Sequence, residues 1–370
     1  MRACSRRAAM RLIVGMSAMP LLAAISAASP EDAGFASDLA DKLDAGIRVD
    51  LLRGLHAVLV WRGGHLVLER YLVGPDESWG KSLGVVTFGP DTLHDLRSVT
   101  KSVVGLLYGI ALGRGIVPPP SARLLAQFPE YPDLVGEPTR SRLTVEQALT
   151  MTLGMAWDEQ RSYADPANSE RAMEDAPDRN RFILDRPFVA EPGTRWIYSG
   201  GATALIGHLI AKGAGTTLQA FAQQALFEPL GITRFEWATG RDGVASAASG
   251  LRLRPRDLLR IGALVLAGGE WQGRRIVSRD WLDGSLRPAI ETGDGLQYGR
   301  LWWLGDATTP ALPGARRWAA GFGNGGQRLW LMPDADLAVV IMSGNYNAPD
   351  AGLTPNRVWR EIVLQNLRRA

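Results

Sequence analysis

The alternation of apolar and polar residues near the start of the chain predicts a β-hairpin. Residues 56–61 and 65–71 are rich in β-branched and aromatic side chains, and two glycines at positions 63–64 supply a tight turn between them. The following residues, 74–93, are rich in glycine, proline and aspartate, and this composition predicts a long loop. The folded part of the chain is therefore expected to begin with two paired strands.

Beyond this hairpin the pattern becomes helical and then extended again. Apolar residues recur at helical spacing from about 98 to 268, interrupted by proline and glycine. The tail is expected to hold further strands and one closing helix: strands at 298–304, 316–320, 326–332 and 337–343, a turn at 333–336, and a helix over 355–367. A sheet built from both ends of the chain, with a helical region inserted, is an α+β arrangement.

The same patterns define the expected domain organisation. Residues 29–370 form one domain in this interpretation. Its sheet subdomain consists of about 50–97 and 270–370, and its helical subdomain of about 98–269. No repeat, low-complexity tract or long linker divides it.

The first 28 residues have the pattern of an export signal. Four arginines precede a short apolar run, and the small residues at 26–28 suit a signal peptidase. The apolar run is too short to span a bilayer, so no stable membrane anchor is expected after its removal. We therefore expect a periplasmic or secreted protein. The arginine pair Arg6-Arg7 also resembles a twin-arginine signal, and both export routes stay open.

Removing the signal changes the charge of the protein. The whole chain has 41 basic and 38 acidic residues, but the signal contains four of the basic ones and no acid, which leaves 37 against 38. Without a basic tract, nucleic-acid binding is not expected. The only cysteine, Cys4, lies inside the signal, which excludes a disulfide framework, a cysteine-based zinc site and a thiol nucleophile.

Candidate chemistry begins at Ser98, three residues before Lys101 and at the start of an apolar helical pattern. At this spacing the hydroxyl and the amine share one helix face. Free N–H groups of the first turn stabilise negative charge on oxygen. Burial in an apolar helix should also lower the pKa of the lysine and make it a usable base.

Two observations compete with this interpretation. Serine is a common helix cap and a lysine can extend to water, so the spacing alone does not decide. Ser78 and Lys81 repeat the same spacing, but Pro75 and Gly80 disfavour a helix there. Ser98 is therefore the candidate nucleophile, provided that other motifs support it.

Two further motifs follow in order: Tyr198-Ser199-Gly200-Gly201, and Gly323-Asn324-Gly325-Gly326-Gln327 before a strand. With Ser98 and Lys101 they make the chain similar, over about 54–367, to the serine β-lactamase-related and penicillin-binding superfamily. The resemblance is to its class C-like branch, which includes family VIII carboxylesterases and 6-aminohexanoate-dimer hydrolases. It implies a β-lactamase/transpeptidase-like fold with the active site between the sheet and the helical region.

The resemblance also implies roles for these residues. Ser98 would form an acyl-enzyme, and Lys101 would accept its proton. Tyr198 would transfer a proton to the leaving group and activate water for deacylation. Whether Lys101 or Tyr198 is the general base stays open. The oxyanion hole would consist of the N–H groups of Ser98 and Gln327, and a shift of one residue in the alignment would move the second donor to Gly326. Asn324, Gly325 and Gly326 would contact the substrate, in the place of a K-T-G motif. No cofactor or metal is implied.

Departures from the family pattern bear on the substrate. Gly200 stands where β-lactamases have the asparagine of Tyr-x-Asn, and neutral Asn324 stands where K-T-G has a cation. In the family the asparagine contacts the substrate amide and the cation pairs with the substrate carboxylate. Both losses therefore disfavour β-lactam and D-Ala-D-Ala substrates, unless Arg317 or Arg328 supplies the charge. A small-molecule ester or small amide is therefore the expected substrate. A β-lactamase, a DD-carboxypeptidase and a non-catalytic cell-wall-binding protein are the alternatives.

Other residues are assigned structural roles. His56, His65, His94 and His208 show no metal-ligand spacing. Four tryptophans near the third motif are expected mainly in the core: Trp302, Trp303, Trp318 and Trp330. The stretch Trp157-Asp158-Glu159 lies in an irregular segment and is not assigned a function.

Overall fold

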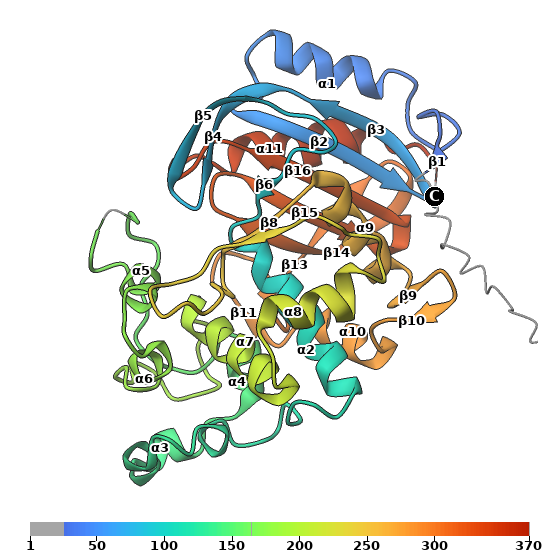
Figure 1. The fold of residues 1–370 in the computed structure, drawn as a ribbon. Helices are drawn as coiled ribbons and strands as arrows, with labels where there is room; N and C mark the ends of the chain where they lie inside the picture. Colours follow the sequence, from blue (N-terminus) through green and yellow to red (C-terminus); the bar gives the residue numbers. More distant parts are fainter. Residues whose placement is uncertain (1–25, 164, 370) are drawn as a thin grey trace, which may run out of the picture.

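A computed structural model describes residues 26–163 and 165–369 (Figure 1). Most of the predicted export signal therefore lies outside the described residues. Its last part, strand β1 (Ser26–Ala27), pairs in parallel with β3 at the edge of the main sheet. Within the described residues, no helix combines the length and the apolar character needed to cross a membrane.

The main sheet joins the two ends of the chain, as the sequence pattern predicts. Its strands lie in the order β1-β3-β2-β16-β15-β14-β13-β12-β11, and all pairs after the first are antiparallel. The early hairpin consists of β2 (Leu55–Arg62) and β3 (His65–Tyr71), and β2 pairs directly with the last strand. The remaining strands come from the tail: β11 (Ile290–Glu291), β12 (Gln297–Tyr298), β13 (Trp303–Thr309), β14 (Leu312–Gly323), β15 (Gln327–Met332) and β16 (Leu337–Ser343).

Helices cover both faces of this sheet (Figure 1). On one face α1 (Leu39–Arg48) packs beside a C-terminal helix that begins as α11 (Leu353–Arg357) and runs to Asn366. On the other face, α9 (Pro255–Leu266) packs on β2, β15 and β16, and α2 (Val99–Gly113) crosses β14. The central strands are buried on both sides, which explains their almost continuous apolar sequences.

The helical region begins with α2, which is buried from Val99 to Ala111. Helix α7 (Gly200–Ala214) packs along it. Shorter helices surround this pair: α3 (Pro138–Ser141), α4 (Val145–Leu149), α5 (Ser169–Glu174), α6 (Arg179–Leu184), α8 (Leu218–Ala222) and α10 (Arg279–Ser285). Because neighbouring elements enclose this apolar helix on all sides, the residues at its N-terminus are held in a fixed position.

Three small strand groups were not predicted. The segment expected to be a long loop is instead a hairpin of β4 (Val73–Ser78) and β5 (Lys81–Thr87), whose turn at Trp79 and Gly80 has positive φ at both residues. That prediction was wrong because the exposed strands of this hairpin lack a buried apolar face. Ser78 and Lys81 pair across its two strands, so their spacing is not helical.

The other two groups lie around the helical region. β6 (His94–Asp95), β8 (Leu251–Leu253) and β7 (Glu236–Trp237) form a three-stranded sheet that leads into α2. β9 (Glu270–Trp271) pairs with β10 (Arg274–Arg275). The predicted strand 298–304 is also corrected: it is divided between β12 and β13 by a turn in which Leu301 has φ of 61°.

Candidate functional site

Ser98 occupies the N-cap position of α2 and is a partly buried residue. Arg97, immediately before it, has φ of 48°, a left-handed conformation that a bulky residue adopts only under constraint. Arg97 is constrained by ion pairs with Glu77 and Asp95. Ser98 is therefore presented at a sharp turn between a short strand and a buried helix.

Lys101 lies one turn further along α2, and its ammonium is buried, with 1% of the side chain exposed. Its Nζ donates to Ser98 Oγ at 3.0 Å, to Glu159 Oε1 at 3.3 Å and to the carbonyl of Ala248 at 3.3 Å. The alternative in which Lys101 extends to water is excluded by this burial. The serine and the lysine are in direct contact, as the spacing predicts.

Tyr198 completes the group from a different element. It immediately precedes Ser199, which caps α7 by accepting from the N–H of Ala202. The Lys101 Nζ lies 4.6 Å from the centre of the Tyr198 ring. Since α2 and α7 pack along each other, the two N-termini bring the three predicted residues together.

Glu159 is a member of this site that the sequence interpretation left unassigned. Its carboxylate accepts from Lys101, from the indole of Trp157 at 2.7 Å and from the N–H of Gly200 at 2.6 Å. It comes from an irregular segment far from both helices in sequence, so no local spacing pointed to it. The only signal for Glu159 in the sequence was its place shortly after Trp157 in an irregular segment.

The glycines of the second motif make room for this carboxylate. A Cβ added at Gly200 would meet Glu159 Oε2 at 3.0 Å, and a Cβ added at Gly201 would meet the ring of Trp157 at 2.6 Å. Both are tighter than ordinary van der Waals contact. Gly200 therefore replaces the expected asparagine because Glu159 approaches the start of α7 from the same side.

The charges of these groups correct one expectation. Burial lowers the pKa of Lys101, but Glu159, with smaller contributions from Tyr198 and Glu170, raises it by more, so that the net shift is upward. The prediction that burial lowers the pKa of the lysine was wrong, because a buried carboxylate faces it. Burial also raises the pKa of Glu159 and of Tyr198, and Lys101 opposes both shifts.

The third motif forms the turn between β14 and β15 and lies against the start of α2. A Cβ at Gly323 would meet the carbonyl of Leu96 and, at 3.1 Å, Cβ of Arg97. Gly325 and Gly326 have φ of 84° and 96°, which glycine adopts without strain and which close the turn. The motif is therefore next to the nucleophile, as expected.

Within the motif, two side chains have structural partners. The amide of Asn324 donates to Asn347 Oδ1 at 3.1 Å and accepts from the Asn347 N–H at 2.8 Å. Gln327 is buried, and its amide bonds to both the N–H and the carbonyl of Ser343. No hydrogen bond or ring contact in the described part of the chain joins Gln327 to Ser98, Lys101 or Tyr198.

Two backbone donors remain available near the nucleophile. Among the described residues, the N–H groups of Ser98 and Asn324 donate no hydrogen bond. Both belong to segments that meet where Gly323 contacts Leu96 and Arg97. Unpaired N–H groups at such a position suit a developing oxyanion.

Aromatic side chains enclose Tyr198. Trp196 and Trp303 lie 5.6 Å from it between ring centres, and Tyr298 lies 6.4 Å away. Of the four tryptophans expected in the core, Trp302, Trp318 and Trp330 are buried, whereas Trp303 is half-buried and reaches the site.

The two arginines considered as carboxylate partners are otherwise engaged. Arg317 pairs with Asp306 on the exposed end of the sheet. Arg328 lies over the ring of Phe322, 4.5 Å from its centre, and donates to the carbonyls of Gly323 and Gln327.

A hollow of about 510 Å³ lies beside this group. Four carboxylates line it together with two arginines and polar or aromatic residues: Glu77, Glu170, Glu174, Asp175, Arg97, Arg171, Trp79, Gly80, Ser162, Tyr163 and Asn347. Arg97 precedes Ser98, and a Cβ on Gly200 would lie 3.2 Å from Glu170 Cδ, so the hollow adjoins the site. Acidic side chains outnumber basic ones along its wall.

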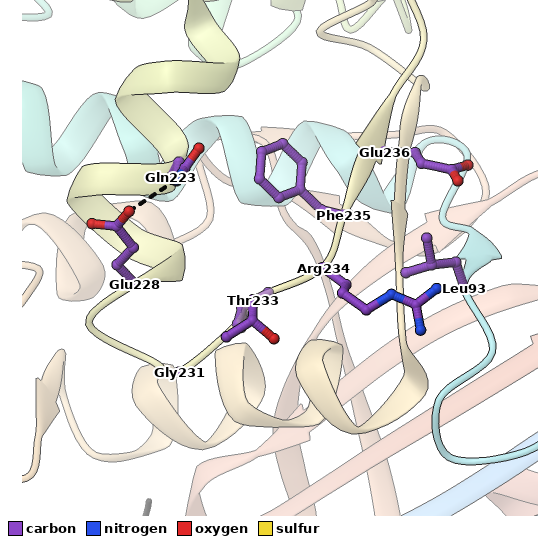
Figure 2. A pocket seen from close by; sticks show the side chains of 9 residues that line it. Leu93, Gln223, Glu228, Gly231, Thr233, Arg234, Phe235 and Glu236 are labelled. Atoms are coloured by element: carbon purple, nitrogen blue, oxygen red, sulfur yellow. Dashed lines mark hydrogen bonds between the residues drawn. The ribbon is translucent and has the colours of Figure 1, made fainter. Parts of the chain in front are cut away.

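A separate hollow of about 520 Å³ lies between the end of α8 and β7 (Figure 2). Gln223 donates to Glu228 on one side of it at 2.9 Å, and Phe235 and Glu236 line the other. Ser98, Lys101 and Tyr198 do not line it. It is not part of the site described above.

Comparison with known proteins identifies the family of the chain. A family model described as Beta-lactamase matches residues 52–362. A 6-aminohexanoate-dimer hydrolase of Paenarthrobacter ureafaciens is 26% identical over 339 residues, which cover 85% of this chain and 78% of that protein. A lovastatin esterase of Penicillium rubens is 29% identical over 159 residues, 40% of this chain and 37% of that protein.

A solved structure supports the fold. The class C β-lactamase of Rhodobacter sphaeroides superposes with a TM-score of 0.62 at 18% identity, covering 86% of this chain and 97% of that one. The predicted α+β, β-lactamase/transpeptidase-like fold is thereby confirmed.

Proposed function

Since the chain belongs to the β-lactamase family and is a serine hydrolase, we propose that it cleaves an ester or a small amide through an acyl-enzyme on Ser98. The observation that carries this proposal is the contact of 3.0 Å between Ser98 Oγ and the buried Lys101 ammonium, beside Tyr198. A helix cap needs neither a buried lysine nor a tyrosine next to it. The same observation argues against a non-catalytic binding protein.

In the proposed reaction, Ser98 Oγ attacks the substrate carbonyl and its proton passes into the pair formed by Lys101 and Tyr198. The pair then protonates the leaving alcohol or amine, and the C–O or C–N bond breaks. Water attacks the acyl-enzyme with the same pair as its base, which releases the acid and restores Ser98. In the resting state Lys101 is protonated and donates to both Ser98 and Glu159. Because the Glu159 carboxylate stabilises this positive charge, it affects the pH at which the pair of Lys101 and Tyr198 can accept a proton.

The proposed oxyanion hole uses the N–H of Ser98 and a backbone N–H of the β14–β15 turn. The resemblance assigns this second donor to Gln327. The unpaired N–H of Asn324 and the contact of Gly323 with Leu96 favour Asn324 instead. We therefore propose that the backbone of Asn324, rather than its side chain, acts on the substrate.

The proposed substrate lacks a carboxylate near the reacting bond. The Asn324 side chain is paired with Asn347, position 200 is glycine, and acidic side chains outnumber basic ones along the wall of the adjacent hollow. These features disfavour anionic β-lactams and D-Ala-D-Ala peptides and favour a substrate with a neutral or positively charged end. The names of the two relatives, a dimer hydrolase and an esterase, are consistent with this proposal.

Export to the periplasm or the medium remains part of the proposal and rests on the amino-terminal pattern alone. We also propose that the reaction requires no cofactor and that the protein binds no nucleic acid.

The deciding experiment is hydrolysis of p-nitrophenyl butyrate by the full protein, by Ser98→Ala and by Ser78→Ala. Ser78 has the same spacing to a lysine but lies in the β4–β5 hairpin. We expect Ser98→Ala to lose at least about 1,000-fold in kcat/KM and Ser78→Ala to retain activity. Equal turnover in Ser98→Ala and the parent protein would refute the assignment.

A second comparison tests the substrate class. A p-nitrophenyl ester ending in an ammonium group is expected to react at least about tenfold faster than the matched ester ending in a carboxylate. Nitrocefin turnover above that of both esters would instead favour the β-lactamase alternative.

A further inference from the structure

Three buried side chains from separate strands meet behind the turn that leads to Ser98. They are His56 of β2, Asp76 of β4 and His94 of β6, and one ligand atom of each lies within 4.8 Å of the others. The chain shows no metal-ligand spacing here because the three residues belong to different strands. The fold alone brings them together.

The imidazole of His94 is oriented as in many metal sites. Its Nδ1 lies 3.0 Å from the carbonyl of Asp95, which only accepts, so this nitrogen bears the hydrogen. The lone pair of Nε2 therefore faces the cluster. A ligating histidine whose other ring N–H donates to a backbone carbonyl is the usual arrangement around protein-bound metals.

The distances fit a small divalent ion. His94 Nε2 lies 2.9 Å from His56 Nδ1 and 3.8 Å from Asp76 Oδ1. Ligands about 2.1 Å from a tetrahedral ion are separated by about 3.4 Å, a value that these two distances bracket. The ion would replace the proton that the two imidazoles share, and that proton would pass to solvent.

The surrounding charge also permits a cation. Asp76, Glu77 and Asp95 face two arginines, Arg97 and Arg252, which leaves an excess of negative charge. The second oxygen of Asp76, Oδ2, is buried and accepts no hydrogen bond among the described residues, and the Arg252 guanidinium lies 3.5 Å from it. This oxygen therefore has an ion-pair partner but keeps an unused hydrogen-bond acceptor position, which a second cation could occupy.

A further oxygen lies beside the cluster. The Tyr346 hydroxyl donates to Asp76 Oδ1 at 2.9 Å, and the ring of Phe88 stacks on His56 with 4.1 Å between centres. The cluster is therefore enclosed, with one further oxygen beside it.

From these observations we propose that His56, Asp76 and His94 form a binding site for a divalent first-row transition metal. Two imidazoles and one carboxylate suit Zn²⁺ best among the ions that tolerate a small, buried, four-coordinate site. The ion would join β2 of the main sheet to the β4–β5 hairpin and to β6, which leads directly to Arg97 and Ser98. The role of the ion would be structural, and the proposal of this site does not depend on the proposed reaction.

The test is binding of Zn²⁺ alone to the full protein after dialysis against EDTA, followed by calorimetry and elemental analysis. We expect one equivalent per chain and a higher melting temperature with the metal. Asp76→Asn should weaken binding at least about 100-fold, because even the loss of an outer partner costs 10–100-fold. His65→Ala, which removes an exposed histidine of β3, is the matched control and should bind as the parent does.

Substitution in a buried cluster can also impair folding, so a second measurement uses the unmodified protein. Titration with Co²⁺ alone is expected to give the visible d–d absorption of a four-coordinate centre, which saturates at one equivalent and which Zn²⁺ displaces. No binding by the folded parent protein, or equal binding by the parent and a folded Asp76→Asn, would overturn the proposal.

Discussion

At the scale of single residues, the site depends on one carboxylate that faces a buried ammonium. Glu159 accepts from Lys101, Trp157 and Gly200, and it raises the pKa of both Lys101 and Tyr198. A base must lose its proton before it can accept one from Ser98. The pH at which activity falls on the acidic side of the pH–rate profile should therefore depend on the negative charge of Glu159.

Glu159→Gln tests this relation. Without the negative charge the pKa values of Lys101 and Tyr198 fall, so the base is free at lower pH, and the acidic limb of kcat/KM should move down by about one pH unit or more. Asp158→Asn removes a neighbouring, half-exposed carboxylate and should leave the limb in place. Profiles of p-nitrophenyl butyrate hydrolysis measure both, and an unmoved limb in Glu159→Gln would contradict the electrostatic role.

The residue scale also separates what the sequence predicts from what it does not. Ser98 and Lys101 were predictable because helix geometry alone places residues three apart on one face. Glu159 was not, because it reaches the site through the packing of an irregular segment against α7. For the same reason the direction of the Lys101 pKa was predicted wrongly: burial follows from an apolar pattern, whereas the facing charge does not.

At the scale of elements, the site is assembled where α2 and α7 begin side by side. The approach of residues 157–159 requires glycine in the first turn of α7, where Gly201 contacts the Trp157 ring. The helix pattern of α7 was visible in the sequence, but the reason for its two initial glycines was not. The β4–β5 hairpin was missed because its strands have no buried face to mark them.

Gly201→Ala should therefore reduce activity without unfolding the protein. The added methyl group would push Trp157, whose indole holds Glu159, and we expect kcat/KM to fall about 10- to 100-fold. Gly113→Ala is the matched control, since this α2 glycine has open space around it and alanine favours helix by about 1 kcal/mol. Circular dichroism with steady-state kinetics tests both, and full activity in Gly201→Ala would argue against this role of the glycine.

At the scale of the whole molecule, stability is concentrated where the two ends of the chain pair. β16 lies between β2 and β15, and its seven residues are all buried. The α+β class and the pairing of both chain ends were predicted from the strand patterns. The order of the nine strands does not follow from those patterns, because strand order depends on long-range packing that a single sequence does not display.

Ile341→Ala should cost about 2–5 kcal/mol of unfolding free energy, since the side chain is fully buried beside Val58. Val85→Ala, on the exposed hairpin, removes an apolar side chain that is 75% exposed and should change stability by less than about 0.5 kcal/mol. Urea unfolding of the two variants compares them directly. Equal losses would mean that the central strands do not dominate stability.

The pairing of β2 with β16 also has a consequence for how the protein is made. Val60 leaves the ribosome long before its partner Val339 is synthesised. The apolar faces of the first hairpin therefore stay without their main partner during most of translation. Pairing of strands that lie so far apart in sequence is slow, because a long loop must close before the contacts form.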